Sequence, residues 1–497
     1  MTTSPPQGFQ VSQVRSAVKE AAAQNENALY LGRGSSGWAW AAPERSVLVL
    51  GPSRSGKTSS LIVPNVLAAP GAVVSTSTKP DVLEMTAVAR SGVGWTFLFD
   101  PSGRVELPRG VTRIGWSPIR TSLTFDGAVL NAEAMVRSAR SSQHSLDLSH
   151  DSHWNERAAS LLAPLLHAAA LNGDPMSKVV TWVNRHQGDA ALGILVDHYG
   201  EEDVAPNLLA GIVTTDPREQ SGIWSTASGA LSAYRSNSAI WSSREPLLDV
   251  ETFCEGQNTL YICAPGRDQQ VFAPLVVGLV SELQDAAYAR SASGRVSPPL
   301  VLALDEVANI APLPNLPSIV SEGPGQGLLT IACLQDLSQA RSRWGKQADS
   351  FISLFGTTVV LSGIADISTL ETLSALGGDK ELTTRSVGES RDMKHAVHYS
   401  SSFSTIFRRR LDVDAIGRGD RGSCLALDAG NRLGWVELTP AHLKSPWRDL
   451  ISNARDRSTR PRGDPELASA PSPGHNATVK DQRSRAQVGP AGRDRSR

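Results

Sequence analysis

The stretch VLVLGPSRSGKTSS, Val47 to Ser60, decides the fold of this chain. It opens with a run of valine and leucine, Val47–Leu50, of the kind that forms a buried parallel strand. The run then breaks into a glycine- and serine-rich turn that ends in Gly-Lys-Thr. We expect a helix to begin near Gly56 and to include the following residues, TSSLIVPNVL. The sequence therefore predicts a strand, a tight turn and a helix in immediate succession.

The turn matches the pattern G-x-x-x-x-G-K-[ST], in which backbone N–H groups surround phosphate oxygens. In this pattern Lys57 reaches the β and γ oxygens of a nucleotide, and Thr58 ligates Mg²⁺. The N-terminal end of the helix dipole adds to the attraction for anions. The bare pattern also arises by chance, but the flanking strand and helix favour phosphate binding. The predicted nucleotide-binding residues are Gly51, Pro52, Ser53, Arg54, Ser55, Gly56, Lys57 and Thr58.

Composition limits the classes of protein to consider. With 497 residues, 40% of them apolar, the chain is long enough for two or three packed domains. The four cysteines form no C-x-x-C and the ten histidines no H-E-x-x-H, which argues for a reducing compartment and against a zinc site. The longest apolar run that we identify, Ser160–Leu171, is too short to span a bilayer, and the N-terminus lacks the apolar stretch of a signal peptide. We therefore expect a soluble chain that reaches a membrane only through a partner.

The C-terminal tail differs in charge from the rest of the chain. Residues 453–497 hold ten basic and five acidic residues, whereas the remaining residues carry a net charge of −6. The tail is rich in Pro, Ser, Gly and Arg, and this composition predicts disorder. Contact with DNA or anionic lipid and a solvated tail without a specific partner are both open interpretations.

Strand-like and helical segments alternate along most of the chain, which predicts a doubly wound α/β sheet. The alternation stops between about Ser122 and Arg244, where apolar residues recur at helical spacing, as in Trp154–Leu166. We expect an all-helical domain here, inserted between strands, with its Trp and Leu residues in a core. The predicted strands are Ala72–Ser77, Thr96–Asp100, Thr259–Pro265, Leu300–Glu306, Leu328–Gln335 and Thr357–Gly363, besides Val47–Leu50.

Two carboxylates, Asp305 and Glu306, end one of these strands. In a protein with a phosphate-binding loop, the first acid meets the Mg²⁺ shell, usually through water, and the next orients the attacking water as a general base. Asp followed by Glu suits repeated ATP hydrolysis, and the chain has no N-K-x-D to support guanine specificity. Gln335 ends the next strand and is predicted either to sense the γ-phosphate or to cap a helix or face solvent. Lys57, Glu306 and Gln335 are thus the predicted catalytic residues, and Thr58 and Asp305 the predicted Mg²⁺-side residues.

These motifs, in this order, resemble the conjugative coupling proteins, the TraG/VirD4/TraD family of type IV secretion ATPases, within the broader translocase group that includes FtsK. With gaps, the resemblance extends from Trp38 to Leu443. It implies a RecA-like nucleotide domain with an inserted all-α domain, a homo-hexamer at the inner membrane, and ATP-driven transport of single-stranded DNA and relaxase. The segments that carry it are 47–90, 95–101, 154–166, 304–345 and 359–378.

The resemblance implies five regions along the chain, and the sequence departs from the family pattern at three places. The family's D-P-K-G-E-like stretch keeps here only Lys79 and a displaced acid, Asp81. Pro324 stands where the family has an arginine that reaches the neighbouring subunit's nucleotide; Arg341 or Arg343 would have to replace it. The family's pair of N-terminal transmembrane helices is absent, which implies a separate membrane partner or a truncated form. The regions are an N-terminal segment (1–43), two parts of the nucleotide-binding domain (44–121 and 246–450), the all-α insert (122–245) and the basic tail (451–497).

The functional interpretation from sequence is a cytoplasmic P-loop ATPase, peripheral at the inner face of the cell membrane, that binds ATP and Mg²⁺ and moves DNA. Its implied partners are single-stranded DNA, relaxase and membrane-embedded secretion components. Trp182, Trp224 and Trp241 are candidates for base stacking, with core packing as the alternative. A nucleotide-binding adaptor that docks cargo with little hydrolysis, and an FtsK-like motor on double-stranded DNA, remain as alternative functions.

Overall fold

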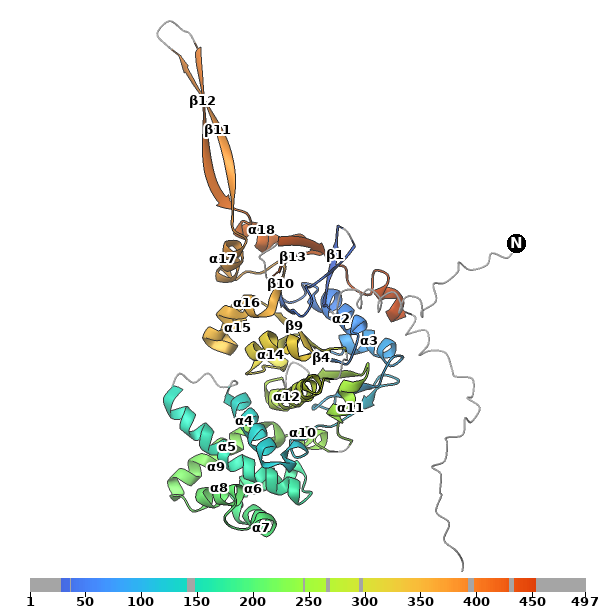
Figure 1. The fold of residues 1–497 in the computed structure, drawn as a ribbon, viewed down its shortest axis with the longest axis vertical. Helices are drawn as coiled ribbons and strands as arrows, with labels where there is room; N and C mark the ends of the chain where they lie inside the picture. Colours follow the sequence, from blue (N-terminus) through green and yellow to red (C-terminus); the bar gives the residue numbers. More distant parts are fainter. Residues whose placement is uncertain are drawn as a thin grey trace, which may run out of the picture. The chain divides into compact units, whose positions relative to one another are not determined.

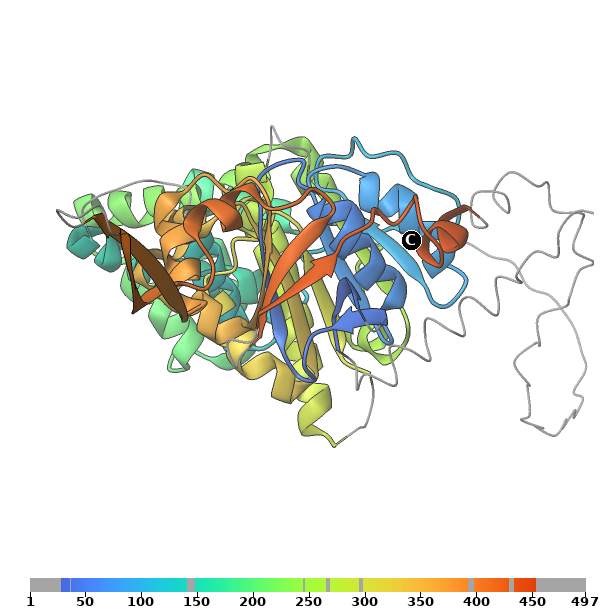
Figure 2. The same cartoon turned by 90° about the horizontal axis from the view of Figure 1, so that it is seen from above.

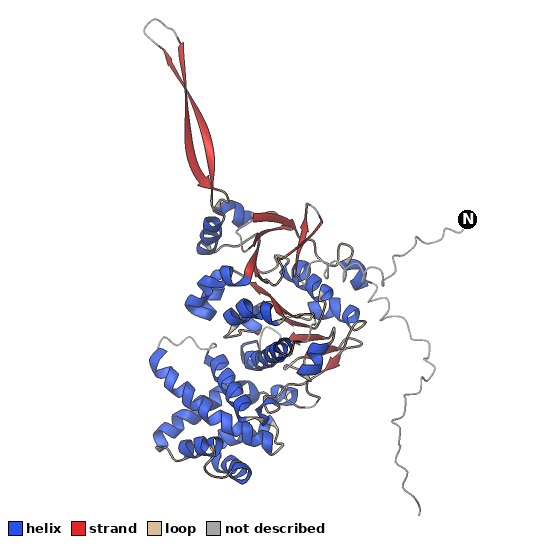
Figure 3. Cartoon of the chain, viewed as in Figure 1, coloured by secondary structure: helices blue, strands red, loops and turns tan. Residues whose placement is uncertain are grey.

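The computed structural model describes residues 28–35, 37–140, 148–244, 246–264, 269–294, 298–391, 397–428 and 433–452 (Figures 1 and 3). The predicted disordered tail from residue 453 and the first 27 residues lie outside this range. The described residues fall into one compact unit. They form a large sheet with helices on both faces, a helical region, and a separate two-stranded ribbon.

The large sheet has twelve strands in the order β2-β1-β14-β13-β10-β3-β9-β8-β4-β7-β5-β6. The eight strands from β10 to β6 run parallel, as crossovers through helices require. Every strand predicted from an apolar run is present, so the predicted α/β sheet is confirmed. These strands are β3 (Ser46–Leu50), β4 (Val73–Ser77), β5 (Thr96–Phe99), β7 (Thr259–Cys263), β8 (Leu300–Leu304), β9 (Leu328–Leu334) and β10 (Gly356–Leu361).

Sequence reasoning missed the antiparallel part of the sheet. β13 pairs with the edge of β10, and the order continues through β14 to the hairpin β1–β2. Residues 30–34 and 37–40, which lie in the expected N-terminal segment, thus pair within this sheet. These strands are short and only partly apolar, so no local pattern marks them. The missed antiparallel strands are β1 (Tyr30–Gly34), β2 (Gly37–Trp40), β13 (Ser423–Asp428) and β14 (Leu433–Glu437), and the two-residue parallel edge strand β6 (Thr112–Arg113) was missed as well.

The sheet separates two hydrophobic cores, because alternate residues of a strand point to opposite faces. In β3, Leu48 and Leu50 belong to one core, while Val47 and Val49 belong to the other. Figure 2 shows helices on both sides of the sheet. One face is covered by η1 (Thr58–Ile62), α2 (Val63–Ala68) and α3 (Asp81–Arg90), and the other by α12 (Gln269–Ala292), α13 (Val307–Ile310), α14 (Leu316–Glu322), α15 (Leu337–Trp344) and α16 (Phe351–Phe355).

The chain between β6 and β7 is helical. Its central helix is α5, whose Leu161 and Leu165 are fully buried, as predicted for a core stripe. Trp182 and Trp224 are also buried, so both are core residues, whereas Trp241 is 56% exposed. The helices are α4 (Phe125–Arg140), α5 (Leu148–Leu171), α6 (Met176–Arg185), α7 (Gly188–Tyr199), α8 (Val204–Val213), α9 (Pro217–Ala230), α10 (Asn237–Ser242) and α11 (Val250–Glu255).

Among the described residues, one helix is long and apolar enough to cross a membrane, a stretch that the search for apolar runs overlooked. It is the Val271–Ala292 part of α12, with a mean hydropathy of 1.2, and 67% of it is buried. Its residues Val276 and Leu279 lie in the core, and it packs against α4, α11 and α13. Such burial is typical of a core helix.

The ribbon consists of β11 (Asp379–Arg391) and β12 (Val397–Arg409), which pair only with each other. In the chain, β11 follows α17 (Ile367–Leu376), and α18 (Val413–Arg418) follows β12. Figure 1 shows the ribbon extending away from these two helices. The sequence analysis did not predict it, because its strands are rich in Ser, Thr and charged residues and lack a buried apolar face.

Candidate functional site

The predicted site residues meet at the carboxyl edge of the parallel strands. Leu50 at the end of β3 is in register with Leu334 of β9, and Leu304 of β8 with Thr76 of β4. The residues that follow these strand ends therefore share one edge. This is the edge where open α/β sheets bind ligands.

The loop after β3 requires glycine at two positions. A Cβ on Gly51 would lie 3.0 Å from Cβ of Leu361, and Gly56 has φ of +98°, a conformation that other residues rarely adopt. Ser60 N–H donates to the Gly56 carbonyl at 2.9 Å, so the helical turns begin at Gly56 as predicted. The first turns form a π-helix, η1, that continues into α2.

Lys57 is held at the floor of this loop. Its side chain is largely buried, and Nζ donates to the carbonyl oxygens of Gly51 at 2.5 Å and Pro52 at 2.8 Å. Nearby, Oγ of Ser55 is buried and has no hydrogen-bond partner among the described residues. A buried polar atom of this kind costs free energy until it is paired. The loop therefore presents an ammonium group and an unpaired hydroxyl where its pattern predicts phosphate.

Thr58 and Asp305 come together from positions 247 residues apart in the chain. The Thr58 hydroxyl donates to Oδ2 of Asp305 at 2.6 Å. The Asp305 backbone is fixed to β4, since its N–H donates to the Thr76 carbonyl and the Thr76 hydroxyl donates to the Asp305 carbonyl, both at 3.3 Å. Burial raises the pKa of Asp305, and the Thr58 hydrogen bond and the Lys57 charge oppose this rise. A hydroxyl and a buried carboxylate side by side fit Mg²⁺, which prefers oxygen ligands.

Glu306 follows in a strained backbone conformation. Its φ is +51°, in the left-handed region, and it stands at the start of the short helix α13. Asn309 Nδ2 donates to its carboxylate at 3.4 Å. The side chain is half-buried and lines the same cavity as Lys57. Non-glycine residues held at positive φ often mark functional sites, because the surrounding structure has to offset the strain.

These groups surround a cavity of about 390 Å³. Lys79 and Asp81, of which sequence reasoning made little, are part of its wall, because β4 ends at the same edge as β3 and β8. The signal for them was their position just after a predicted strand. The lining residues are Ser53, Arg54, Ser55, Gly56, Lys57, Thr58, Ser59, Ser77, Thr78, Lys79, Asp81, Met85, Asp305 and Glu306.

Gln335 lies at the same edge but is not among the residues that line the cavity. The N–H of Gly51 donates to the Leu334 carbonyl at 3.1 Å, so Gln335 directly follows a residue bonded to the loop. Its side chain is exposed, and its N–H donates to the Gln339 side chain at 2.9 Å. The cap of α15 is Asp336, which accepts from the Gln339 N–H. Gln335 therefore does not cap α15, since the N-cap residue is Asp336.

The candidate replacements for the family arginine are both constrained. Pro324 lies in a short 3₁₀ turn, η4 (Gly323–Gln326), that offers no cation. Arg341 is engaged within its own chain, since Nε donates to Asp349 at 2.9 Å and Nη1 to Ser368 at 3.3 Å. Burial lowers the pKa of Arg343. Neither arginine is among the residues that line the cavity.

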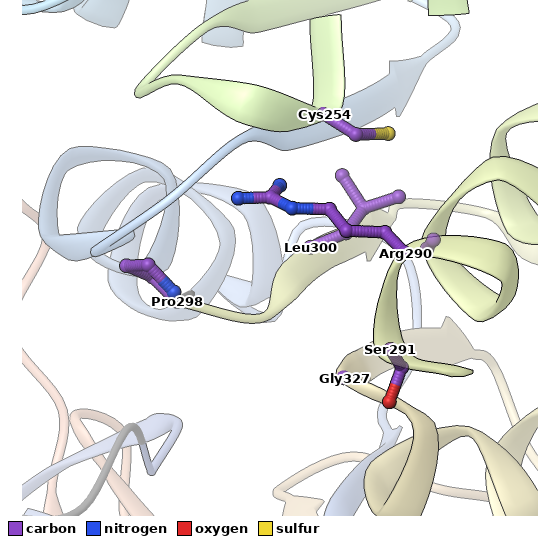
Figure 4. A pocket seen from close by; sticks show the side chains of 7 residues that line it. Cys254, Arg290, Ser291, Pro298, Leu300 and Gly327 are labelled. Atoms are coloured by element: carbon purple, nitrogen blue, oxygen red, sulfur yellow. The ribbon is translucent and has the colours of Figure 1, made fainter. Parts of the chain in front are cut away.

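A second pocket lies near the opposite, amino-terminal edge of the sheet (Figure 4). Its wall includes Cys254, Arg290 and Leu300, the first residue of β8. Burial raises the pKa of the Cys254 thiol to about 12, so the thiol is not ionised at neutral pH. Within the ranges that the structure describes, no group of His, Cys, Asp and Glu is arranged to hold a metal ion.

The chain is similar to a described protein family and to solved structures. The family model for type IV secretory system conjugative DNA transfer matches residues 9–418. The unbound form of TrwBdeltaN70, a fragment of a bacterial conjugative coupling protein, matches with a TM-score of 0.61 and 18% identity, over 86% of this chain and 91% of the fragment. The complex of TrwB with a non-hydrolysable ATP analogue has a TM-score of 0.58 and 20% identity, over 80% of this chain and 86% of the TrwB chain. The complex of TrwB with ADP and Mg²⁺ has a TM-score of 0.57 and 19% identity, again over 80% of this chain and 86% of the TrwB chain. No curated protein matches the chain significantly.

Proposed function

The chain belongs to the type IV secretory system conjugative DNA transfer family, and from this premise we propose that it is an ATP-driven coupling protein. In this proposal it delivers single-stranded DNA and its relaxase to the secretion channel. The observation that carries the proposal is the 2.6 Å hydrogen bond from Thr58 to Asp305. It supports the proposal because it joins the loop after β3 to an acidic strand end, a pair of elements that a P-loop nucleoside triphosphatase needs.

The loop residues would bind the phosphates of ATP. Backbone N–H groups of the loop between Ser53 and Thr58 would surround the anion, and Lys57 Nζ would exchange its carbonyl partners for the β and γ oxygens. Thr58 and Asp305 would hold Mg²⁺, Thr58 as a ligand and Asp305 through water. When bound, the metal withdraws negative charge from the phosphates. The complexes of TrwB with an ATP analogue and with ADP and Mg²⁺ support this ligand choice.

Glu306 is the proposed general base. Its carboxylate lies on the wall of the same cavity as Lys57, where it would orient a water molecule and accept its proton. Gln335 would respond to loss of the γ-phosphate from outside the cavity wall, acting through the loop to which its strand is bonded. The movement would then pass to the helical region between β6 and β7, which we propose grips DNA. Trp241 is the one stacking candidate there that is exposed.

The assembly and location are proposals of the same kind. We propose a homo-hexamer with ATP between subunits, at the inner face of the cell membrane and bound there by membrane-embedded secretion components. The domain boundaries at residues 43, 121, 245 and 450 remain proposals with it. Family membership supports this picture.

The test is steady-state phosphate release from Mg²⁺-ATP by the full chain, with and without single-stranded DNA, over a range of protein concentrations. We expect turnover that rises with DNA and increases more than proportionally with protein concentration, because sites between subunits form only on assembly. Turnover that is independent of DNA would contradict the motor. Double-stranded DNA in a parallel assay separates this function from an FtsK-like motor.

One observation favours the adaptor as a second candidate function. Pro324 supplies no cation, and Arg341 is already paired with Asp349. Loss of such an arginine costs roughly 10³- to 10⁵-fold in rate. Tight ATP binding with near-zero turnover at every protein concentration, with or without DNA, would support a cargo-docking adaptor and contradict the motor.

A further inference from the structure

We propose that the β11–β12 ribbon is a contact surface for single-stranded nucleic acid, with bases against its aromatic face and phosphates at its basic root. This inference rests on the proposed function, because it names a surface through which such a protein would hold its DNA. It does not involve the nucleotide cavity. Three independent features of the ribbon carry it: its charge, its exposed aromatic residues and its attachment to the catalytic edge.

The charge of the ribbon is opposite to that of its surroundings. Residues 379–410 hold seven Lys or Arg against four Asp or Glu, a net charge of +3, whereas residues 1–452 together carry −6. At the root, Lys380 and Arg408 stand directly opposite each other across the two strands, and both are exposed. Like charges in such a pair destabilise a ribbon. An anion between them removes that cost, and the exposed Arg410 is two residues further along the chain.

The other face of the ribbon exposes aromatic side chains. Phe403 is 69% and Phe407 72% exposed. They lie on the same face, since they are four residues apart in one strand, a spacing of about 13 Å. Arg385, opposite Phe403, holds its guanidinium 5.7 Å from the centre of that ring. Exposed rings combined with arginine are the stacking platform of proteins that bind single strands.

The basic pair and the exposed aromatic residues lie on opposite faces of a ribbon that is only two strands wide. Neighbouring strands are separated by about 5 Å, so a flexible single strand that passes over one edge reaches both faces. A rigid duplex does not bend around so narrow an element. The segment between the strands, residues 392–396, reads DMKHA. This polar sequence does not favour insertion into lipid, which requires an apolar end.

The root of the ribbon is tied to the edge that holds the nucleotide site. Arg410 N–H donates to the Gly378 carbonyl at 2.8 Å, and Ser374 of α17 donates to the Leu411 carbonyl at 2.6 Å. The same helix accepts, through the Thr369 hydroxyl, a 3.0 Å hydrogen bond from the N–H of Leu337. Leu337 is the first residue of α15 and lies three residues after Leu334, the last residue of β9. A continuous set of contacts thus links the strand beside the phosphate loop to the ribbon.

The test measures binding of a fluorescently labelled oligodeoxythymidylate of about 20 nucleotides, longer than a usual single-strand site. The double variant Phe403→Ala/Phe407→Ala is expected to raise the Kd about tenfold or more, because each stacked base contributes substantially. The variant Lys380→Ser/Arg408→Ser is expected to reduce the slope of log K against log salt by about 1.4, which corresponds to two phosphate contacts. A labelled duplex is expected to respond little to the aromatic change.

Two controls match these variants. Ser386→Ala/Ser402→Ala removes a cross-strand pair from the same ribbon, and Trp95→Ala removes a 71% exposed aromatic residue elsewhere. Neither is expected to change the Kd or the salt slope. Binding of a fluorescent ATP analogue, measured on all four variants, is expected to equal that of the unaltered chain. A loss of nucleotide binding together with DNA binding would indicate a folding defect and would overturn the assignment of the effect to the ribbon.

The remaining outcomes distinguish a failure of the ribbon inference from a failure of the proposed function. If the unaltered chain binds no DNA, the proposed function fails and the ribbon inference with it. If it binds DNA and both ribbon variants bind equally well, only the inference fails. Unchanged DNA binding with lost binding to phosphatidylglycerol vesicles would overturn the inference in favour of a lipid contact. Unchanged DNA binding with altered sedimentation would overturn it in favour of a contact between copies of the chain.

Discussion

The phosphate-binding edge and the β11–β12 ribbon hold functional side chains in opposite ways. At the edge, Lys57 and Asp305 are largely buried, and each is fixed by hydrogen bonds to backbone or to a partner on another strand. On the ribbon, Phe403 and Phe407 are exposed and the strands pair only with each other. A site that has to position phosphate atoms therefore uses the core as its support. A surface that has to accommodate a flexible strand does not.

The largest expected effect falls on the edge. Lys57→Ala removes the ammonium group aimed at the phosphates, and we expect ATP turnover to fall by a factor of about 10² or more, since a preorganised charge is worth that much. Nucleotide binding falls with it. Steady-state phosphate release and titration with a fluorescent ATP analogue measure the two effects. Turnover retained by the purified variant would contradict the role of Lys57.

Glu306→Gln is expected to separate binding from chemistry. The amide keeps the shape of the side chain but does not accept a proton, so turnover should fall by about 10²-fold. ATP binding should remain close to that of the unaltered chain, because Lys57 and Thr58 are intact. The same two assays decide the outcome. Equal losses of binding and turnover would place Glu306 in phosphate binding instead.

Stability is expected to follow burial rather than function. Leu302→Ala, in the middle of β8 and fully buried, should lower the free energy of unfolding by about 2–5 kcal/mol. Phe403→Ala on the ribbon should change it by less than about 0.5 kcal/mol. Chemical denaturation of both variants compares the two regions directly. A comparable loss in the two would mean that the ribbon packs against a surface in solution.

The smallest expected effect concerns the pH dependence of the nucleotide-free protein. Burial raises the pKa of Asp305 above its ordinary value of 3.8, so the folded state binds this proton more tightly than the unfolded state. The resulting stabilisation is fully present below the ordinary value and is lost as pH rises through the raised pKa. Asp305→Asn should therefore flatten the change of Tm with pH above 3.8, although it should also reduce turnover. A Tm profile that is identical in the two proteins would contradict the direction of this shift.

The sequence predicted the parallel sheet well because fully buried strands are continuous apolar runs. Val47–Leu50 and Leu300–Leu304 can be read without any knowledge of their neighbours. The ribbon escaped prediction because its strands contain no continuous apolar run, and β13 escaped because its place beside β10 depends on the fold. The polar sequence of β11 is stabilised by pairing with β12, which begins six residues later. No local pattern of apolar residues marks such a pair.

The sequence by itself determined the phosphate loop, since Gly51, Gly56, Lys57 and Thr58 lie within one turn and act through their own backbone geometry. It also identified Asp305 and Glu306 as acids at a strand end. Only the tertiary structure decided that Asp305 meets Thr58, because two strands far apart in the chain had to be placed in one sheet. The tertiary structure also brought Lys79 and Asp81 to the cavity and left Gln335 outside its wall. The spacing of residues along the chain determines a local turn, whereas the distance between residues on different strands depends on the order of those strands in the sheet.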